Sequence, residues 1–261
     1  MFYPEAHIFR FDSLAEFVRA ALDCGPRGDV GKWTFGKEFP DRESTVRALT
    51  SGVSGSVVRQ FADKARGAME IEMEAADLQG YTRRRRRVWS DQGDPDTDRV
   101  LDRRELWASD SIRGKQARVI RLGINVWMSC GNEEIDFANL VGTACAIADT
   151  IAKLGYGIEI VGMLAGVCNC DSRGFVVTFP IKRAADPLDI EAVGSIGAPG
   201  LMRDLGFSFG DKHLYGNWHG GCRVREDELK AAAGIDYLVT RSWSAYSLAS
   251  TFEGVKAILE S

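Results

Sequence analysis

The sequence predicts an α/β protein in which a core sheet is flanked by helices, with an N-terminal helical elaboration. Apolar and β-branched residues dominate 119–127, a helical apolar pattern covers 133–154, and a second apolar run follows at 158–161. A strand, a long helix and another strand in this order are typical of a parallel pair joined by a right-handed crossover. The chain is therefore expected to be α/β from about residue 117 onward.

Before this core, the sequence predicts a strand followed by helices. Residues 7–11 alternate between apolar and polar, as a short strand does. Ser13 and Glu16 have the spacing of a capping box, which starts a helix. Helical apolar spacing resumes over 42–78, and the glycines within 52–55 divide it into two helices.

After the first core strand, one long helix and several shorter elements are expected. A third strand is predicted at 175–181, a short helix at 201–205, a late strand at 237–240 and a closing helix at 247–260. The long helix at 133–154 is expected to bury a single face. That face consists of Ile135, Ala138, Val141, Cys145, Ala148 and Ala152.

From residue 118 onward, several sequence segments occur in the same order and at the same spacing as in a known family. They are the strand at 119–127, NLVGTA at 139–144, GYGIEI at 155–160, PIKRAADPLD at 180–189 and LMRDLGF at 201–207. Over residues 118–209 this order resembles a family of phage-encoded proteins of unknown function with a von Willebrand factor A-like core. The resemblance implies a von Willebrand A-like, Rossmannoid sheet.

Domains of the von Willebrand A type hold a divalent ion at the end of their first strand. Their motif is Asp-x-Ser-x-Ser, whose carboxylate and hydroxyls supply hard oxygen ligands. The corresponding residues 125–129 are Asn-Val-Trp-Met-Ser. Asn125 replaces the carboxylate and Trp127 the first serine, so no metal and no cofactor are expected.

The most unusual feature of the chain is the segment 81–121, which contains five consecutive arginines. Twelve basic and seven acidic residues give it a net charge of +5, whereas the whole chain carries −4. Basic charge with interleaved aromatic residues is typical of a surface that binds a polyanion. The candidate nucleic-acid-binding residues are Arg83, Arg84, Arg85, Arg86, Arg87, Trp89, Arg99, Arg103, Arg104, Trp107, Arg113 and Lys115.

Two interpretations of the arginine run remain open from the sequence. In the first, its guanidinium groups neutralise phosphates while Trp89 stacks on a base. In the second, the run is a solvated loop that pairs with the Asp-rich stretch inside 90–98, itself expected to be an exposed turn or mobile loop. These acids would then cover the arginines until a nucleic-acid strand displaces them.

The same choice applies to the short helix that Thr97 is expected to cap. Arg99, Arg103 and Arg104 fall on one side of that helix. Either they contact phosphates, or they form salt bridges with neighbouring acids of the helix.

Cysteines and histidines of the second half offer a weak zinc pattern. Cys168 and Cys170 are too closely spaced, and His213 and His219 too widely spaced, for the usual zinc motifs. Small loop thiols are the better explanation for Cys168, Cys170 and Cys222. The loop at 213–222 is either a binding lip or part of the core.

Lys182 and Arg183 end a predicted strand, where α/β proteins gather ligands. We favour the alternative that they fix the turn by pairing with Asp186 or Asp189.

The sequence lacks the GxxxxGK[ST], GxSxG and HExxH motifs, so no enzyme is expected. No apolar run approaches the roughly 20 residues of a membrane span, and no signal peptide is visible, which favours the cytoplasm, here of an infected bacterial host. The predicted organisation is 1–80 packing on the core, 81–117 as the basic segment and 118–261 as the core.

The favoured function is non-sequence-specific single-stranded DNA binding by a homo-oligomer. In size and acidic charge the chain resembles Drc-type phage proteins, single-stranded-DNA-binding cofactors that recruit a phage RNA polymerase. That resemblance implies such a polymerase as a partner in transcription or replication. The alternatives are a metal-less protein-interaction scaffold and, least favoured, a metal-dependent hydrolase.

Overall fold

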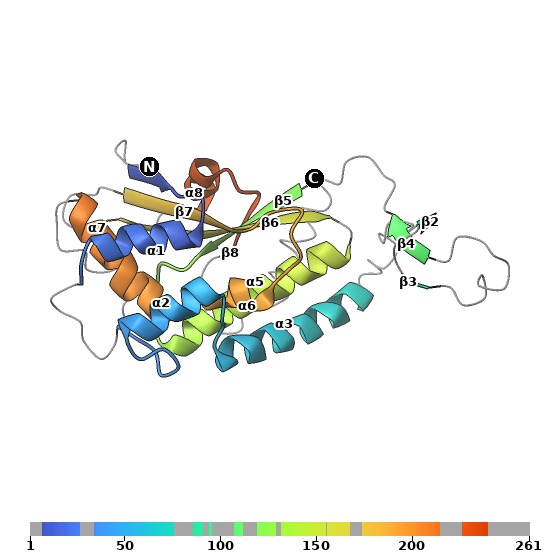
Figure 1. Ribbon diagram of the computed structural model, residues 1–261, viewed down its shortest axis with the longest axis horizontal. Helices are drawn as coiled ribbons and strands as arrows, with labels where there is room; N and C mark the ends of the chain where they lie inside the picture. Colours follow the sequence, from blue (N-terminus) through green and yellow to red (C-terminus); the bar gives the residue numbers. More distant parts are fainter. Residues whose placement is uncertain are drawn as a thin grey trace.

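The computed structural model describes residues 7–26, 34–75, 86–90, 94–95, 107–111, 119–128, 132–154, 156–167, 174–214 and 226–239. These residues form a mixed α/β structure, as predicted, with a five-stranded sheet flanked by helices (Figure 1). A separate three-stranded sheet carries part of the basic segment. The predicted closing helix at 247–260 lies outside the described residues.

The five-stranded sheet has the order β1-β7-β6-β5-β8. Its central strand β6 is parallel to β5 and antiparallel to β7, while β8 is parallel to β5 and β1 is parallel to β7. The predicted parallel pair is confirmed. Only six residues separate β6 from β7, too few for a crossover, so β7 runs in the opposite direction. The strands are β1 (His7–Arg10), β5 (Val119–Asn125), β6 (Gly157–Val167), β7 (Gly174–Lys182) and β8 (Tyr237–Val239).

Helices cover both faces of this sheet. On one face, β5, β6 and β7 share a large hydrophobic core with α1, α2, α3, α5, α6, η2 and α7, and on the other face a smaller cluster joins α8 to β6, β7 and β8. β6 is therefore buried on both faces and is apolar along most of its length. The helices are α1 (Leu14–Asp23), α2 (Arg42–Ser51), α3 (Ser56–Ala75), α5 (Glu134–Lys153), α6 (Ile190–Ser195), the π-helical η2 (Leu201–Gly206), α7 (Phe207–Leu214) and α8 (Glu226–Ala233).

The helix starts and stops follow local signals in the sequence. The Ser13 hydroxyl accepts the N–H of Glu16 at 3.1 Å, as expected, but the Glu16 carboxylate bonds the N–H of Asp12 rather than that of Ser13. Gly52 ends α2 with a φ of 64°, a left-handed conformation that glycine adopts without strain. The predicted division of 42–78 into two helices is confirmed.

The long helix α5 is buried more completely than a single-faced helix would be. It packs between α3 and the sheet, so Phe137, Leu140 and Ile147 are also buried. Ile135 and Ala152, predicted to be on the buried face, are exposed, and Ile135 retains 51% of its accessible surface. The one-face prediction was wrong at these two ends of the helix, which extend beyond the packed layer.

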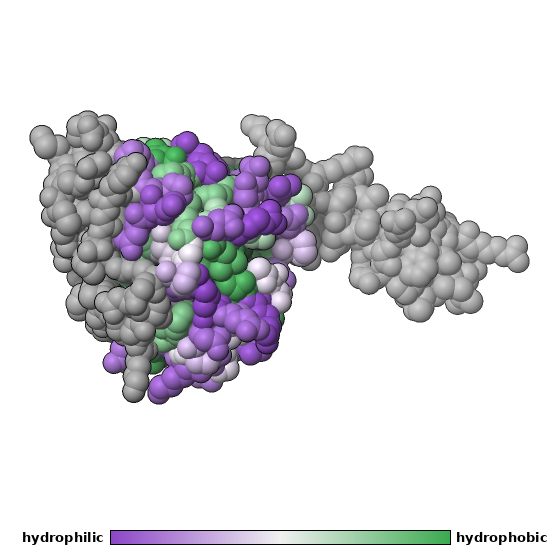
Figure 2. Space-filling view, turned by 60° about the vertical axis from the view of Figure 1, so that its left-hand side comes forward, coloured by the Kyte–Doolittle hydropathy of each residue, from purple (hydrophilic) through white to green (hydrophobic). Residues whose placement is uncertain are grey.

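α5 is long and apolar enough, by length and composition alone, to cross a membrane. Most of its apolar window is buried inside the protein, as in a core helix. On the face shown in Figure 2, hydrophobic residues are interspersed with hydrophilic ones. Among the described residues, the more exposed large apolar side chains include Val53, Ile71 and Ile135, which come from separate elements.

Candidate nucleic-acid interface

Four of the twelve candidate nucleic-acid-binding residues lie in described strands. Arg86, Arg87 and Trp89 belong to β2 (Arg86–Ser90), and Trp107 begins β4 (Trp107–Ser111). The short helix expected around Thr97 lies outside the described residues. The candidates outside them are Arg83, Arg84, Arg85, Arg99, Arg103, Arg104, Arg113 and Lys115.

The two halves of the basic segment pair with each other. β2 and β4 are antiparallel, with Trp89 opposite Ala108 and Ser90 opposite Trp107. The two tryptophans, 18 positions apart in the sequence, therefore occupy neighbouring positions on adjacent strands. Figure 1 shows this small sheet beyond one end of α3, apart from the five-stranded sheet.

Residues 90–98, which were expected to form an exposed turn or mobile loop, contain the third strand of the small sheet. β3 (Asp94–Pro95) pairs antiparallel with the other edge of β4, and Asp94 lies opposite Ala108. At these two residues the loop prediction was wrong, because their main chain continues the ladder. On β2 and β4, Arg87 lies opposite Asp110, so basic and acidic positions share one sheet.

One arginine of the segment 81–121 serves the core sheet instead. Arg121 in β5 forms an ion pair with Glu159 at 3.0 Å and donates to the main-chain oxygen of Gly234 at 2.6 Å. Its own N–H bonds Asp236. These contacts join β5 to β6 and to the chain entering β8, so Arg121 is committed to the fold.

The resemblance to von Willebrand A domains implied a metal motif at the end of β5. Here the Asn125 side-chain oxygen accepts the N–H groups of Trp127 at 3.1 Å and Ala165 at 3.2 Å, which ties β5 to β6. Trp127 is buried and packs edge-on against Phe175 and Phe207. The two residues that depart from the metal motif therefore hold the core together.

The π-helical segment η2 contacts the residues that follow this strand end. The N–H of Met128 lies 2.9 Å from the sulfur of Met202, and Arg203 donates to the main-chain oxygen of Asn132. The Arg203 guanidinium lies 5.1 Å from the centre of the Phe137 ring, and only 5% of the residue is exposed. The sequence predicted a short helix here but gave no signal that its arginine is buried.

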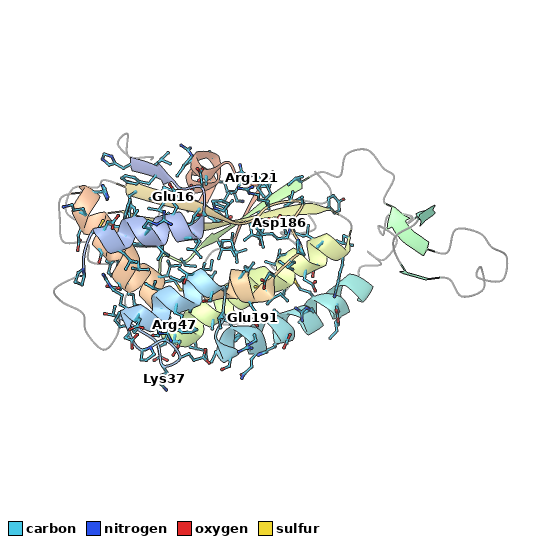
Figure 3. The ribbon with its side chains drawn as sticks, viewed as in Figure 1. Glu16, Lys37, Arg47, Arg121, Asp186 and Glu191 are labelled. Atoms are coloured by element: carbon cyan, nitrogen blue, oxygen red, sulfur yellow. The ribbon has the colours of Figure 1, made fainter. Side chains whose placement is uncertain are left out.

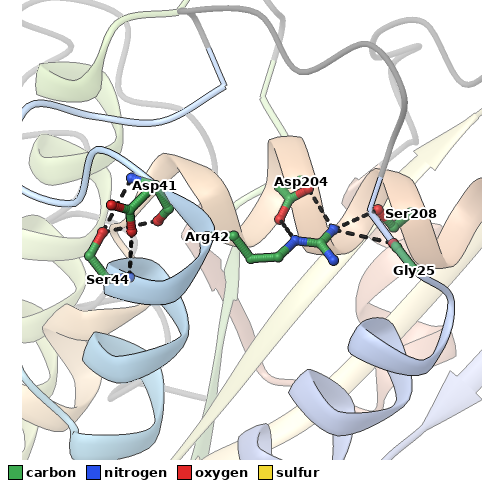
Figure 4. A network of polar contacts seen from close by, with 6 residues as sticks. All are labelled: Gly25, Asp41, Arg42, Ser44, Asp204 and Ser208. Carbon is green, nitrogen blue, oxygen red and sulfur yellow. Dashed lines mark hydrogen bonds and ion pairs between the residues drawn. The ribbon is translucent and has the colours of Figure 1, made fainter.

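Next to Arg203, Asp204 anchors a second buried network (Figure 4). Arg42, the first residue of α2, makes a bidentate pair with the Asp204 carboxylate at 2.6 and 2.7 Å. The same guanidinium donates to the Ser208 hydroxyl at 3.2 Å and to the Gly25 oxygen at 3.3 Å. This group, which we call the Arg42 clasp, joins the chain after α1 and the start of α2 to η2 and α7, and sequence spacing did not indicate it.

Other carboxylates bind the main chain of the N-terminal region in a similar way. Glu134 at the start of α5 accepts the N–H groups of Lys37 and Glu38. Glu191 on α6, which is labelled in Figure 3, accepts the N–H and the hydroxyl of Ser54. Charged residues in this part of the protein are thus engaged in holding the fold.

The cysteines and histidines of the weak zinc pattern are only partly described. His213 lies 3.9 Å from the Cys24 sulfur, whereas Cys168, Cys170 and Cys222 lie outside the described residues. Burial lowers the pKa of His213 and raises the pKa of Cys24, so both shifts favour neutral groups at pH 7. Within the described ranges no three residues of the metal-binding types come together.

Lys182 ends β7 and Arg183 follows it, and the structure fixes this turn through main-chain groups rather than through the side-chain pairs that we favoured. The Lys182 ammonium is buried and donates to the main-chain oxygens of Ile158 at 2.8 Å and Arg183 at 3.0 Å, and burial lowers its pKa. The turn is fixed through the main chain, because Asp186 accepts the N–H of Arg183. Asp189 instead caps α6.

The fold and these contacts describe a mixed α/β protein with a small accessory sheet. The chain belongs to the family described as Domain of unknown function (DUF7192), whose model matches residues 7–242. That match spans the N-terminal helices, the basic segment and the core alike. Neither the curated proteins nor the solved structures contain a match.

Proposed function

We propose that this protein binds single-stranded nucleic acid without strong sequence preference, through the basic segment at 81–117. The observation that carries the proposal is the charge separation between this segment and the rest of the chain. Over 81–117 the ten basic and seven acidic residues give a charge of +3, which leaves −7 for the remaining residues. A polyanion is therefore attracted to one part of the molecule and repelled by the rest.

The arginines of the core support this assignment by contrast. Arg42, Arg66 and Arg121 each pair with a carboxylate of another element, so their charge is neutralised within the fold. In the basic segment 81–117, basic residues outnumber acidic ones ten to seven, so the acids of that segment cannot neutralise all of them one for one. Arginine beside tryptophan supplies both phosphate neutralisation and base stacking.

A binding titration with labelled single-stranded and duplex DNA tests the proposal. Affinity for single strands should fall linearly on a log–log salt plot, with a slope of about −0.7 for each phosphate contact. About six contacts would weaken binding roughly 300-fold between about 50 and about 200 mM salt. No binding to either nucleic acid at the lower salt would overturn the function.

A role beside a phage RNA polymerase, in the cytoplasm of an infected bacterium and as a homo-oligomer, extends this proposal. It is supported by the resemblance of 118–209 to phage-encoded proteins and by the size and acidic charge of the chain. Retention of a phage polymerase on single-stranded DNA coated with the protein, but not on bare DNA, would support the extension.

A second candidate is a protein-interaction scaffold with a von Willebrand A-like core that has lost its metal. The observation in its favour is the end of β5, where the Asn125 side chain bonds two main-chain N–H groups and Trp127 fills the core. This candidate is favoured if the protein binds neither single-stranded nor duplex DNA in the titration above.

A further inference from the structure

The register of the three-stranded sheet sorts its residues onto two faces. Directly opposed residues of an antiparallel pair share a face, and successive residues of a strand alternate between faces. Because β4 is the central strand, its pairings with β2 and β3 fix both faces. The first face carries the positions Arg87, Trp89, Asp94, Ala108 and Asp110. The second face carries Arg86, Val88, Ser90, Pro95, Trp107, Ser109 and Ser111.

These two faces differ in charge. Among the described positions, the first face has one arginine and two aspartates, a net charge of −1. The second face has one arginine and no acid, a net charge of +1. The two tryptophans, which the sequence alone treats as equivalent, fall on opposite faces: Trp89 on the acidic one and Trp107 on the basic one.

The chemistry of a nucleic-acid strand favours the second face. Its arginine position can neutralise a phosphate, and serine hydroxyls are among the groups that commonly bond phosphate oxygens. Trp107 is the position on this face that offers an aromatic surface to a base. On the first face, phosphates would approach Asp94 and Asp110, and like charges repel.

We propose that single-stranded nucleic acid lies on the second face, where Trp107 stacks on a base and Arg86 contacts a phosphate. Trp89 and Arg87 then belong to the first face, whose aspartates repel the phosphates of the nucleic acid. This inference rests on the proposed function and deepens it, since it names which tryptophan and which arginine of the segment contact the ligand.

Matched substitutions on the two faces test the assignment. Affinity for a labelled single-stranded oligothymidine is measured by fluorescence anisotropy at about 50 mM salt for the wild type, Trp107→Ala and Trp89→Ala. Loss of one stacked base should weaken binding about 5- to 150-fold in Trp107→Ala, and Trp89→Ala should stay within about threefold of the wild type. Arg86→Gln and Arg87→Gln form a second pair, in which only Arg86→Gln should weaken binding and lower the salt slope, by about 0.7.

Trp107→Ala could weaken binding because the small sheet no longer forms, so Trp107→Tyr serves as its control. The tyrosine keeps an aromatic ring for stacking, and this variant should therefore retain most of the wild-type affinity. The assignment is overturned if the wild type binds and Trp89→Ala loses as much affinity as Trp107→Ala, or if Trp107→Tyr binds as weakly as Trp107→Ala. If the wild type itself does not bind, the proposed function fails, and this inference fails with it. The two failures are therefore distinguishable.

Discussion

The five-stranded sheet and the three-stranded sheet of this chain use their residues in contrasting ways. In β5 and β6, apolar side chains such as Ile120, Ile124 and Leu164 are fully buried. In β2 (RRVWS) and β4 (WASDS), charged residues and serines occupy most positions. Burial of apolar surface is the main favourable term in folding, so the five-stranded sheet gains far more stabilisation from burial than the three-stranded sheet does. The comparison teaches that packing explains the composition of the first sheet, whereas for the polar composition of the second sheet we propose nucleic-acid binding as the reason.

In the core around the five-stranded sheet, the largest effect on stability is expected at the Arg42 clasp. Asp204→Ala leaves the Arg42 guanidinium, about three-quarters buried, without its carboxylate partner. Breaking such a pair costs several kcal/mol, so the free energy of unfolding should fall by about 3 kcal/mol in urea titrations. Arg47→Ala on the same helix is the control: its pair with Glu43 is exposed, and its loss should cost less than about 1 kcal/mol. Equal losses in the two variants would contradict the account.

In the basic segment, substitution of the arginine run 83–87 should weaken the binding of single-stranded DNA and leave the stability of the protein unchanged. Replacing Arg83–87 by glutamine removes five positive charges from the segment. If each of them except Arg87, which lies on the acidic face of the small sheet, contacts a phosphate, the log–log salt slope for single-stranded DNA should fall by up to about 2.8. The free energy of unfolding should stay within about 0.5 kcal/mol of the wild type, as for surface substitutions. A large loss of stability would show that the run belongs to the core and would break the comparison.

Helix packing gives a third test, at two glycines. A Cβ on Gly142 in α5 would lie 2.7 Å from the Phe61 Cβ and 2.8 Å from the Ala62 nitrogen of α3. Gly142→Ala should therefore destabilise the protein by about 1–3 kcal/mol, because the two helices must separate. Gly67→Ala in α3 is the matched change: a Cβ there has no neighbour within 4 Å, and the higher helix propensity of alanine should add up to about 1 kcal/mol. Thermal unfolding followed by circular dichroism measures both, and a stabilised Gly142→Ala would contradict the close packing.

The smallest effect concerns pH. Burial lowers the pKa of His213 below the usual histidine value of 6.5, so in this pH range the unfolded chain binds a proton more readily than the folded protein does. This histidine therefore destabilises the fold as the pH drops below 6.5 toward its lower folded pKa, and it has no such effect above that range. The ring lies 4.3 Å from the Phe209 ring, so His213→Phe keeps an aromatic contact and removes the titration. Between pH 7.5 and pH 5.5 the wild type should lose slightly more stability than His213→Phe, and the reverse order would contradict the shift.

Periodicity and capping residues predicted most of the large sheet and its helices. The alternation at 7–11, the capping serine at position 13 and the apolar runs around 119–127 and 158–161 correspond to observed elements within a few residues. The face of α5 was predicted less well, since a helix enclosed by α3 and the sheet buries more than one face. Strand β3 was missed because Asp94 and Pro95 are residues typical of turns.

For the candidate site, composition by itself located the basic segment and its two tryptophans. From the resemblance to von Willebrand A domains, the sequence also predicted that Asn125 and Trp127 replace metal ligands, because ligand chemistry depends on residue type. Only the tertiary structure decided what these residues do, since Asn125 accepts the N–H of Ala165 on β6 and Trp127 finds its neighbours on β7 and α7. It likewise decided that Arg42 meets Asp204, 162 positions away, and that Trp89 and Trp107 occupy opposite faces of one sheet. The physical reason is the same in each case: charge and periodicity are local properties of the chain, whereas partners and strand register depend on which distant segments the fold brings together.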